Sequence, residues 1–393
     1  MKKPNTEIEV IQQVLNKELA DFFKEHGIKN FRMISVGNSI ASGYSMVRTI
    51  KPLLLRNETI EKIMKDNGID IERLHFARAQ NNGDEHIFEW LENNIKLSEM
   101  YKLNRNDYSG GITSMQNHGL PEDQIGVYYP ESVKDDKGLK EAALESNANL
   151  ANVIVYNGLT GSFLDVVTRR GNIFKQLISS FDRDYRSLEA TLKLIQTNNR
   201  KNNSNTQVYI CGAPDFLGLK ISEIINHKLR KVTKKYANAV YVEPIKSKFF
   251  YTDLKATEEE DLTTLQGKIK KYLKVPDIHY NEEEYLKLNN NIIRSILQNY
   301  MITKSMINVD RYFYNLSSKV EINKQELVND SEALESFMTS ELKTELKKLE
   351  DKNQKKEFLT KIKEYLTERS PFDFFYLGKK EIKEAVNEVG KKL

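Results

Sequence analysis

Short apolar runs alternate with helical patterns along most of the chain. Residues 7–25 place apolar side chains at helical spacing and end at His26 and Gly27, which predicts an opening amphipathic helix. Five runs rich in strand-forming residues begin at residues 30, 74, 151, 206 and 238: NFRMISV, LHFARA, ANVIVY, TQVYICGAP and NAVYVEPI. Helical patterns separate the later runs. This alternation predicts an α/β fold with a central parallel sheet covered by helices on both faces.

Two regions depart from the alternation. Residues 96–145 are polar and rich in turn residues, and a long insertion of this kind is usually functional. After about residue 300 the chain becomes helical and highly charged, most clearly over residues 339–366. We expect solvated helices with mixed charge pairs there, while binding of a protein partner or oligomerisation stays open. The expected organisation is therefore an α/β domain over residues 1–300 and a helical C-terminal extension over residues 301–393.

Glycine use and charge narrow the class of protein. The chain has 18 glycines, and only Gly267, Gly378 and Gly390 lie beyond residue 218, so glycine marks the turns of the front part. A hydrophobic fraction of 39 % excludes wholesale disorder. The 60 basic and 56 acidic residues are interleaved and leave a net charge of +4. Without a basic stripe, we expect no nucleic-acid partner.

The sequence also bears on cysteine chemistry, membranes and location. The single cysteine, Cys211, cannot form an intramolecular disulfide, and its apolar run predicts a buried core thiol. Without a CxxC pair or a His/Cys cluster, we expect no metal site. The longest uncharged run, 146–164, holds four Asn residues and so predicts no transmembrane segment. A polar stretch follows Lys2 and Lys3 instead of a signal peptide. We therefore expect a cytoplasmic protein, although a signal removed earlier would leave no trace.

The first candidate for chemistry is the segment Gly37–Gly43, which directly follows the first predicted strand. Ser39 lies where the strand turns toward a helix, so its hydroxyl would stand at the carboxyl edge of the sheet. The N–H groups at the start of such a helix can receive a developing negative charge. The alternative is that Ser39 only caps the next helix, a common role for serine.

The second candidate is the segment 275–281, with sequence VPDIHYN, which precedes a predicted helix. His279 carries the side chain best suited to remove a proton from a serine hydroxyl near neutral pH. Asp277 lies two residues earlier and could hold the imidazole in the correct orientation. The alternative is a loop histidine with a structural hydrogen bond, so it is the combination with Ser39 that suggests catalysis.

Two further turns complete four blocks in order. Gly83 follows the second strand, and Asn157-Gly158-Leu159-Thr160-Gly161 follows the third. Over roughly residues 28–298 the arrangement resembles the SGNH, or GDSL-type, hydrolase superfamily. That family has a serine in a Gly-Asp-Ser context after its first strand and a glycine after its second. It has an Asn in a Gly-x-Asn-Asp turn after its third strand and an Asp-x-x-His near the end.

The resemblance implies a flavodoxin-like three-layer α/β/α sandwich and a serine hydrolase. The enzyme would cleave carboxylic esters, as an esterase, lipase or deacetylase, through an acyl-serine on Ser39 with His279 and Asp277 as its partners. The oxyanion hole would comprise the N–H groups of Ser39 and Gly83 and a side chain of Asn157 or Thr160. No metal or organic cofactor is implied, and the substrate would be an ester-containing small molecule, a lipid or an acylated glycan.

The chain departs from the family pattern at three places. Asn38 stands where the family has an acidic residue, Thr160 stands where it has Asn, and Asp277 precedes His279 by two residues instead of three. These departures leave two alternatives. The chain could be a binding or scaffolding protein that has lost efficient catalysis, or an acyltransferase that uses the same triad.

Overall fold

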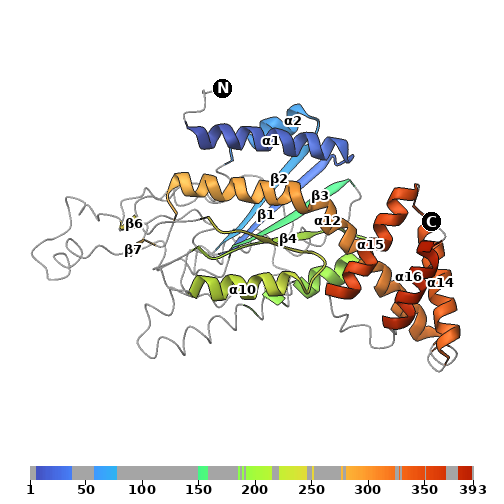
Figure 1. Cartoon of the computed structure of the whole chain (residues 1–393). Helices are drawn as coiled ribbons and strands as arrows, with labels where there is room; N and C mark the ends of the chain where they lie inside the picture. The colour runs from blue at the N-terminus through green and yellow to red at the C-terminus, as the bar shows by residue number, and fades with distance from the viewer. Residues whose placement is uncertain are drawn as a thin grey trace, which may run out of the picture.

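Five parallel strands form the centre of the protein, in the spatial order β2-β1-β3-β4-β5 (Figure 1). The strands are β1 (Asn30–Gly37), β2 (Asp70–Ala77), β3 (Leu150–Asn157), β4 (Gln207–Cys211) and β5 (Ala239–Val242). The computed structural model describes residues 6–37, 57–77, 149–157, 185, 188–189, 192–214, 221–245, 250–251, 276–277, 280–323, 327, 330–349, 351–368 and 379–391. The prediction of an α/β fold with a parallel sheet is confirmed.

Each of the five apolar runs contributes residues to a strand, but β2 begins four residues before the run that predicted it. Its first half is polar, with Glu72 and Arg73 among its residues. Glu72 forms an ion pair with Arg32 of the neighbouring strand β1. Arg73 donates from Nε to Glu61 of α2 (Ile60–Asp66) at 3.0 Å. Because these charged side chains have partners, this polar segment can form part of the sheet. A search for apolar runs does not detect such a strand start.

Helices lie on both sides of the sheet (Figure 1). The predicted opening helix is confirmed as α1 (Glu7–Glu25), which shares one side with α12 (Glu282–Ile322). On the other side lies α10 (Ile221–Thr233). All eight residues of β3 are buried, as expected for a strand with both faces covered.

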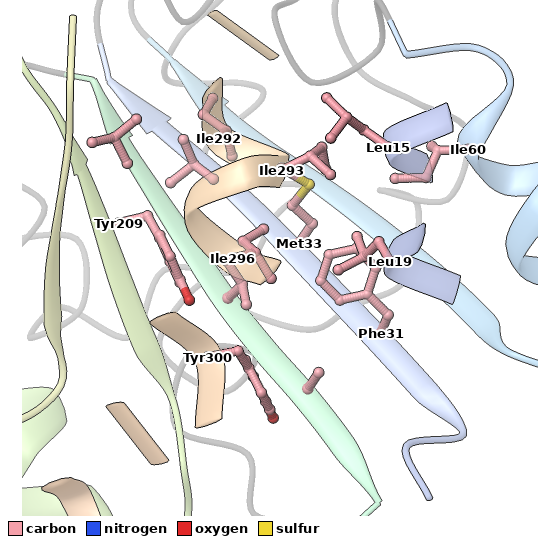
Figure 2. Close-up of a cluster of buried hydrophobic side chains, with 14 of the residues drawn as sticks. Leu15, Leu19, Phe31, Met33, Ile60, Tyr209, Ile292, Ile293, Ile296 and Tyr300 are labelled. Atoms are coloured by element: carbon pink, nitrogen blue, oxygen red, sulfur yellow. The ribbon is translucent and has the colours of Figure 1, made fainter. Parts of the chain in front are cut away.

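The largest core lies between the sheet and the pair α1 and α12 (Figure 2). Leu15 and Leu19 of α1 meet Phe31 and Met33 of β1 in this layer. Full burial of such a side chain stabilises the fold by about 1.5–3 kcal/mol. The remaining labelled residues that close the core come from α2, strand β4 and the first half of α12, and they are Ile60, Tyr209, Ile292, Ile293, Ile296 and Tyr300. We call this layer the sheet core.

The helix α12 continues far beyond the sheet. Its 41 residues span about 60 Å, and its second half packs with α14 (Ser331–Lys347), α15 (Lys352–Glu368) and α16 (Lys379–Lys391). These helices form a bundle at one end of the molecule (Figure 1). A second apolar cluster fills the bundle, and it begins on α12 at Met306. We call it the bundle core.

Residues 339–366 differ from the expected solvated helix. They form the end of α14 and most of α15, two helices separated around residue 350. The apolar positions Leu342, Leu346, Leu359 and Ile362 are buried in the bundle core. The charged residues between them occupy the outer surface, where Lys319 pairs with Glu341. The dense charge on the outer face therefore obscured an ordinary amphipathic pattern.

A buried carboxylate joins the bundle to the α/β part. Asp310 of α12 is 1 % exposed and accepts two hydrogen bonds from Arg200, from Nε at 2.7 Å and from Nη2 at 2.9 Å. It also accepts from Nε2 of Gln196 at 2.9 Å and from the hydroxyl of Tyr365 in α15 at 2.6 Å. Gln196 and Arg200 belong to the helical residues 192–202, which precede β4. One carboxylate of α12 thus links this helix to two others, the helical residues 192–202 and α15.

No helix in the described part of the chain is both long enough and apolar enough to cross a membrane.

Removal of the charge of Asp310 should destabilise the protein. In Asp310→Asn, an amide N–H group faces the donors of Arg200 or Tyr365, and the guanidinium loses its buried counter-charge. We expect the free energy of unfolding, measured by urea denaturation, to fall by about 3–5 kcal/mol. Glu321→Gln, which changes an exposed acid on the same helix, should shift it by less than about 0.5 kcal/mol. An Asp310→Asn protein as stable as the wild type would contradict this account of the junction.

Candidate functional site

The strand order defines where a ligand would be expected. The chain passes from β1 outward to β2 and then returns to β3 on the other side of β1. In open parallel sheets, ligands bind outside the carboxyl ends of the strands at such a reversal. In the register, Gly37 lies opposite both Ala77 and Asn157. The three strands that precede the first three candidate blocks therefore end at one level of the same edge.

Two of the predicted site residues lie in described strands. Asn157 is the last residue of β3. Asp277 lies in the short strand β7 (Pro276–Asp277), where it is paired with Phe250 of β6 (Phe250–Tyr251). Four predicted residues lie outside the described residues, and these are Ser39, Gly83, Thr160 and His279.

The side chain of Asn157 is only 4 % exposed, and within the described part of the chain its Nδ2 has no hydrogen-bond partner. A buried donor without a partner costs about 1–3 kcal/mol. Ser35 of β1 is 1 % exposed, and its Oγ also lacks a partner among the described residues. By strand alternation Ser35 shares a face with Met33, and Asn157 shares a face with Val155. Because Met33 and Val155 both belong to the sheet core, the two unpaired groups lie on the side of the sheet that α12 covers.

Cys211 ends the neighbouring strand β4. Because Ile210 is opposite Tyr156 in the register, Cys211 and Asn157 are neighbours across the two strands. The thiol is buried, and burial raises its pKa to about 12. A thiol with this pKa stays protonated at neutral pH and is a poor nucleophile. The prediction of a core thiol at Cys211 is confirmed.

Tyr280 fixes the position of the chain just after His279. Its ring is 2 % exposed and belongs to the sheet core together with Cys211. Burial raises the pKa of its phenol well above the usual value, and the Cys211 thiol contributes to the same shift. The two side chains are therefore neighbours. Tyr280, the residue after His279, thus lies against the sheet near Cys211 at the carboxyl end of β4, one strand away from Asn157.

The turn after β4 is held rigidly at the same edge. Asn226 of α10 accepts from the N–H of Ala213 at 2.7 Å and donates to its carbonyl oxygen at 2.8 Å. At Gly212, a Cβ atom would meet the hydroxyl of Tyr241 and would stand 2.8 Å from Cδ of Pro244. Only glycine fits this position without displacement of its neighbours.

Two buried polar residues at this edge were not among the predicted site residues, Ser35 and Glu284. Ser35 stands inside an apolar strand pattern, where its burial gives no separate signal. Glu284 is 5 % exposed and lies in the first turn of α12. The spacing Asn281-x-x-Glu284 does identify a helix start, but it says nothing about burial.

The described residues contain no group of three or more His, Cys, Asp or Glu side chains that could hold a metal ion. No protein-family model matches the chain, and neither a curated protein nor a solved structure shows significant similarity to it.

Proposed function

We propose that the protein is a serine hydrolase of the SGNH type that cleaves carboxylic esters. The strand order supports this proposal, because 2-1-3-4-5 is the order of flavodoxin-like sheets and the helices on both sides fit a three-layer α/β/α sandwich. On this topology, Ser39 follows β1 by two residues and the third candidate block begins at the end of β3. The carboxyl ends of β1 and β3 belong to the edge where such folds bind their ligands.

The observation that carries the proposal is the buried amide of Asn157, which has no hydrogen-bond partner among the described residues. A buried N–H donor without a partner destabilises the folded protein, so its retention suggests that a ligand supplies the acceptor. A carbonyl oxygen that becomes negative during acyl transfer is such an acceptor. Asn157 lies level with Gly37, two residues before the proposed nucleophile. Between the two side chains left open by the sequence, we therefore assign the third oxyanion donor to Asn157 and not to Thr160.

The proposed reaction has two steps. His279 removes the proton from Oγ of Ser39, which attacks the ester carbonyl, while the N–H groups of Ser39 and Gly83 and Nδ2 of Asn157 hold the oxyanion. The tetrahedral intermediate collapses, the bond to the alcohol breaks, and His279 gives its proton to the departing oxygen. Water, activated by His279, then attacks the acyl-serine and releases the acid. A carboxylate must hold the imidazole in place, and Asp277 is the candidate that the sequence pattern offers.

The nucleophile can be tested by covalent labelling. A fluorophosphonate probe should label Ser39 in the wild type, Ser39→Ala should remove the label, and His279→Ala should slow labelling about 10²- to 10⁴-fold. The labelled residue is identified by mass spectrometry after digestion. Ser42→Ala, three residues further along, should label at the wild-type rate. Absence of wild-type labelling, or a label that persists in Ser39→Ala, would reject the serine-hydrolase proposal.

The same protein distinguishes hydrolysis from acyl transfer. With p-nitrophenyl acetate, we expect a burst of p-nitrophenol followed by turnover that an added acceptor alcohol does not accelerate. Faster steady-state release with the alcohol would identify an acyltransferase instead. The measurement is stopped-flow absorbance with and without the acceptor.

The role of Asn157 predicts opposite effects on activity and stability. Asn157→Leu has nearly the same volume and removes the donor, so kcat should fall about 10²- to 10³-fold with little change in KM. Because the lost amide has no partner in the described part of the chain, the melting temperature should stay equal or rise. Thr160→Val, which removes the hydroxyl of the alternative donor, should keep full activity. Loss of activity in Thr160→Val but not in Asn157→Leu would assign the donor to Thr160.

A further inference from the structure

Three buried polar side chains in the layer between the sheet and the pair α1 and α12 carry an atom that no described residue pairs. The atoms are Nε2 of Gln12 on α1, Oγ of Ser35 on β1 and Oδ1 of Asn290 on α12. The three side chains are 5 %, 1 % and 4 % exposed, in the same order. Burial of a polar atom without a partner destabilises a folded protein, so three of them on three neighbouring elements require an explanation. We call these side chains the polar cluster.

A buried amide one turn along α1 shows the contrast. Asn16 is fully buried. Its Nδ2 donates to Oδ1 of Asn57 at 2.6 Å and to Oγ1 of Thr59 at 3.0 Å, and its Oδ1 accepts from Nδ2 of Asn57 at 2.7 Å. Nε2 of Gln12 has no such partner among the described residues. This helix therefore pairs one of its buried amides with the rest of the fold and leaves a donor of the next one available.

Gln12 and Ser35 lie at the same level between α1 and β1. Phe23 of α1 contacts Phe31 of β1, with ring centroids 4.9 Å apart. The helix and the strand run in opposite directions, so positions before Phe23 face positions after Phe31 (Figure 1). Gln12 lies about 16 Å back along α1, three turns before Phe23 on the same side of the helix. Ser35 lies about 13 Å beyond Phe31 on the same face of the strand.

Asn290 brings α12 to this level. The ring of Tyr300 also contacts Phe23, with centroids 5.7 Å apart, and Asn290 lies about 15 Å back along α12 from Tyr300. Nδ2 of Asn290 donates to the carbonyl oxygen of Ile8 at 3.3 Å, one turn before Gln12. The acceptor Oδ1 of Asn290 and the donor Nε2 of Gln12 therefore belong to adjoining turns of two packed helices.

The polar cluster adjoins the residue that carries the proposed function. Ser35 precedes Gly37 by two residues, and Gly37 is opposite Asn157 in the register. Ser35 and Asn157 face the same side of the sheet, so they are separated by about 7 Å along the strands. The cluster therefore lies just behind the carboxyl edge, inside the layer that α1 and α12 cover.

The four side chains select the chemistry of a ligand. None of them is charged, so an ion would lose its hydration there without a counter-charge from them. An apolar group would satisfy none of them. Gln12 and Asn157 offer N–H donors, Asn290 offers an acceptor, and the hydroxyl of Ser35 takes either role. A hydroxyl group accepts and donates through a single oxygen, which suits a donor and an acceptor on adjoining turns.

We infer that Gln12, Ser35 and Asn290 form a subsite for a hydroxyl group of the substrate whose carbonyl oxygen Asn157 binds. The substrate hydroxyl accepts from Nε2 of Gln12 and donates to Oδ1 of Asn290, beside Oγ of Ser35. The subsite lies in the covered layer, so it holds the part of the substrate that stays bound when the alcohol departs. The substrate class is therefore an ester of a hydroxylated acid, an assignment that rests on the proposed function.

Two esters of the same shape test the subsite. Ethyl β-hydroxybutyrate carries a hydroxyl where ethyl isovalerate carries a methyl group. A site that pairs a substrate hydroxyl discriminates against an analogue without it, because its own polar groups are then left without partners. We expect kcat/KM of the wild type, measured by pH-stat titration, to favour the hydroxy ester about tenfold or more.

Variants with little change in volume assign this preference to the polar cluster. In Gln12→Met and in Ser35→Ala, the ratio of kcat/KM between the two esters should fall toward one. Gln13→Met changes the neighbouring, half-buried glutamine and should keep the wild-type ratio. The melting temperature of Gln12→Met should stay equal or rise, because the lost N–H group has no partner among the described residues. A lower melting temperature with an unchanged ratio would show a structural role and overturn the subsite.

The subsite and the proposed function fail in different ways. A wild type that cleaves both esters equally well overturns the subsite and leaves the hydrolase proposal standing. If neither ester is cleaved, the hydrolase proposal fails, and an NMR titration of the wild type decides on the subsite. The side-chain N–H signal of Gln12, identified by its loss in Gln12→Met, should shift with ethyl β-hydroxybutyrate and not with ethyl isovalerate. Equal shifts, or no shift with either ester, reject the subsite.

Discussion

The packing of α12 against the sheet is the contact on which the other features depend. Its first half supplies Ile292, Ile296 and Tyr300 to the sheet core, and its second half forms the centre of the bundle core. Because a helix is stiff over this length, the two cores share one axis and cannot be placed independently. The same packing brings the first turn of α12 to the carboxyl edge of the sheet, since Tyr280 is buried there beside Cys211.

Two kinds of buried polar group occur around this framework, and they have different physical meanings. Asp310 has four hydrogen bonds from three residues, so its burial is compensated and its role is structural. Asn157 and Ser35 present buried donor groups that find no partner in the described part of the chain. Folding alone gains nothing from such groups. Their place at the carboxyl edge, where parallel sheets bind ligands, is what connects them with chemistry.

Much of the fold could be predicted from the sequence, because apolar runs of strand length and the 3.6-residue period reflect burial directly. The start of β2 was missed because Glu72 and Arg73 are stabilised by partners that lie 40 and 12 residues away along the chain. The break between α14 and α15 was missed because mixed charge hid the apolar face. Asn157 was identified as one of two possible donors, and the proposal in its favour rests on the lack of a partner for its amide among the described residues. Glu284 was missed because burial of a capping residue depends on what packs over it, which no local pattern records.

The carboxylate of Asp310 also has a consequence for how the chain matures as it is synthesised. Arg200 is made 110 residues before it and Tyr365 is made 55 residues after it. During translation the Asp310 carboxylate can be neutralised by Arg200 early, but its last hydrogen bond forms only when α15 has left the ribosome. The junction is therefore completed late. The strands of the sheet are all synthesised before α15, but the last hydrogen bond to the buried Asp310 carboxylate can form only after α15 is present.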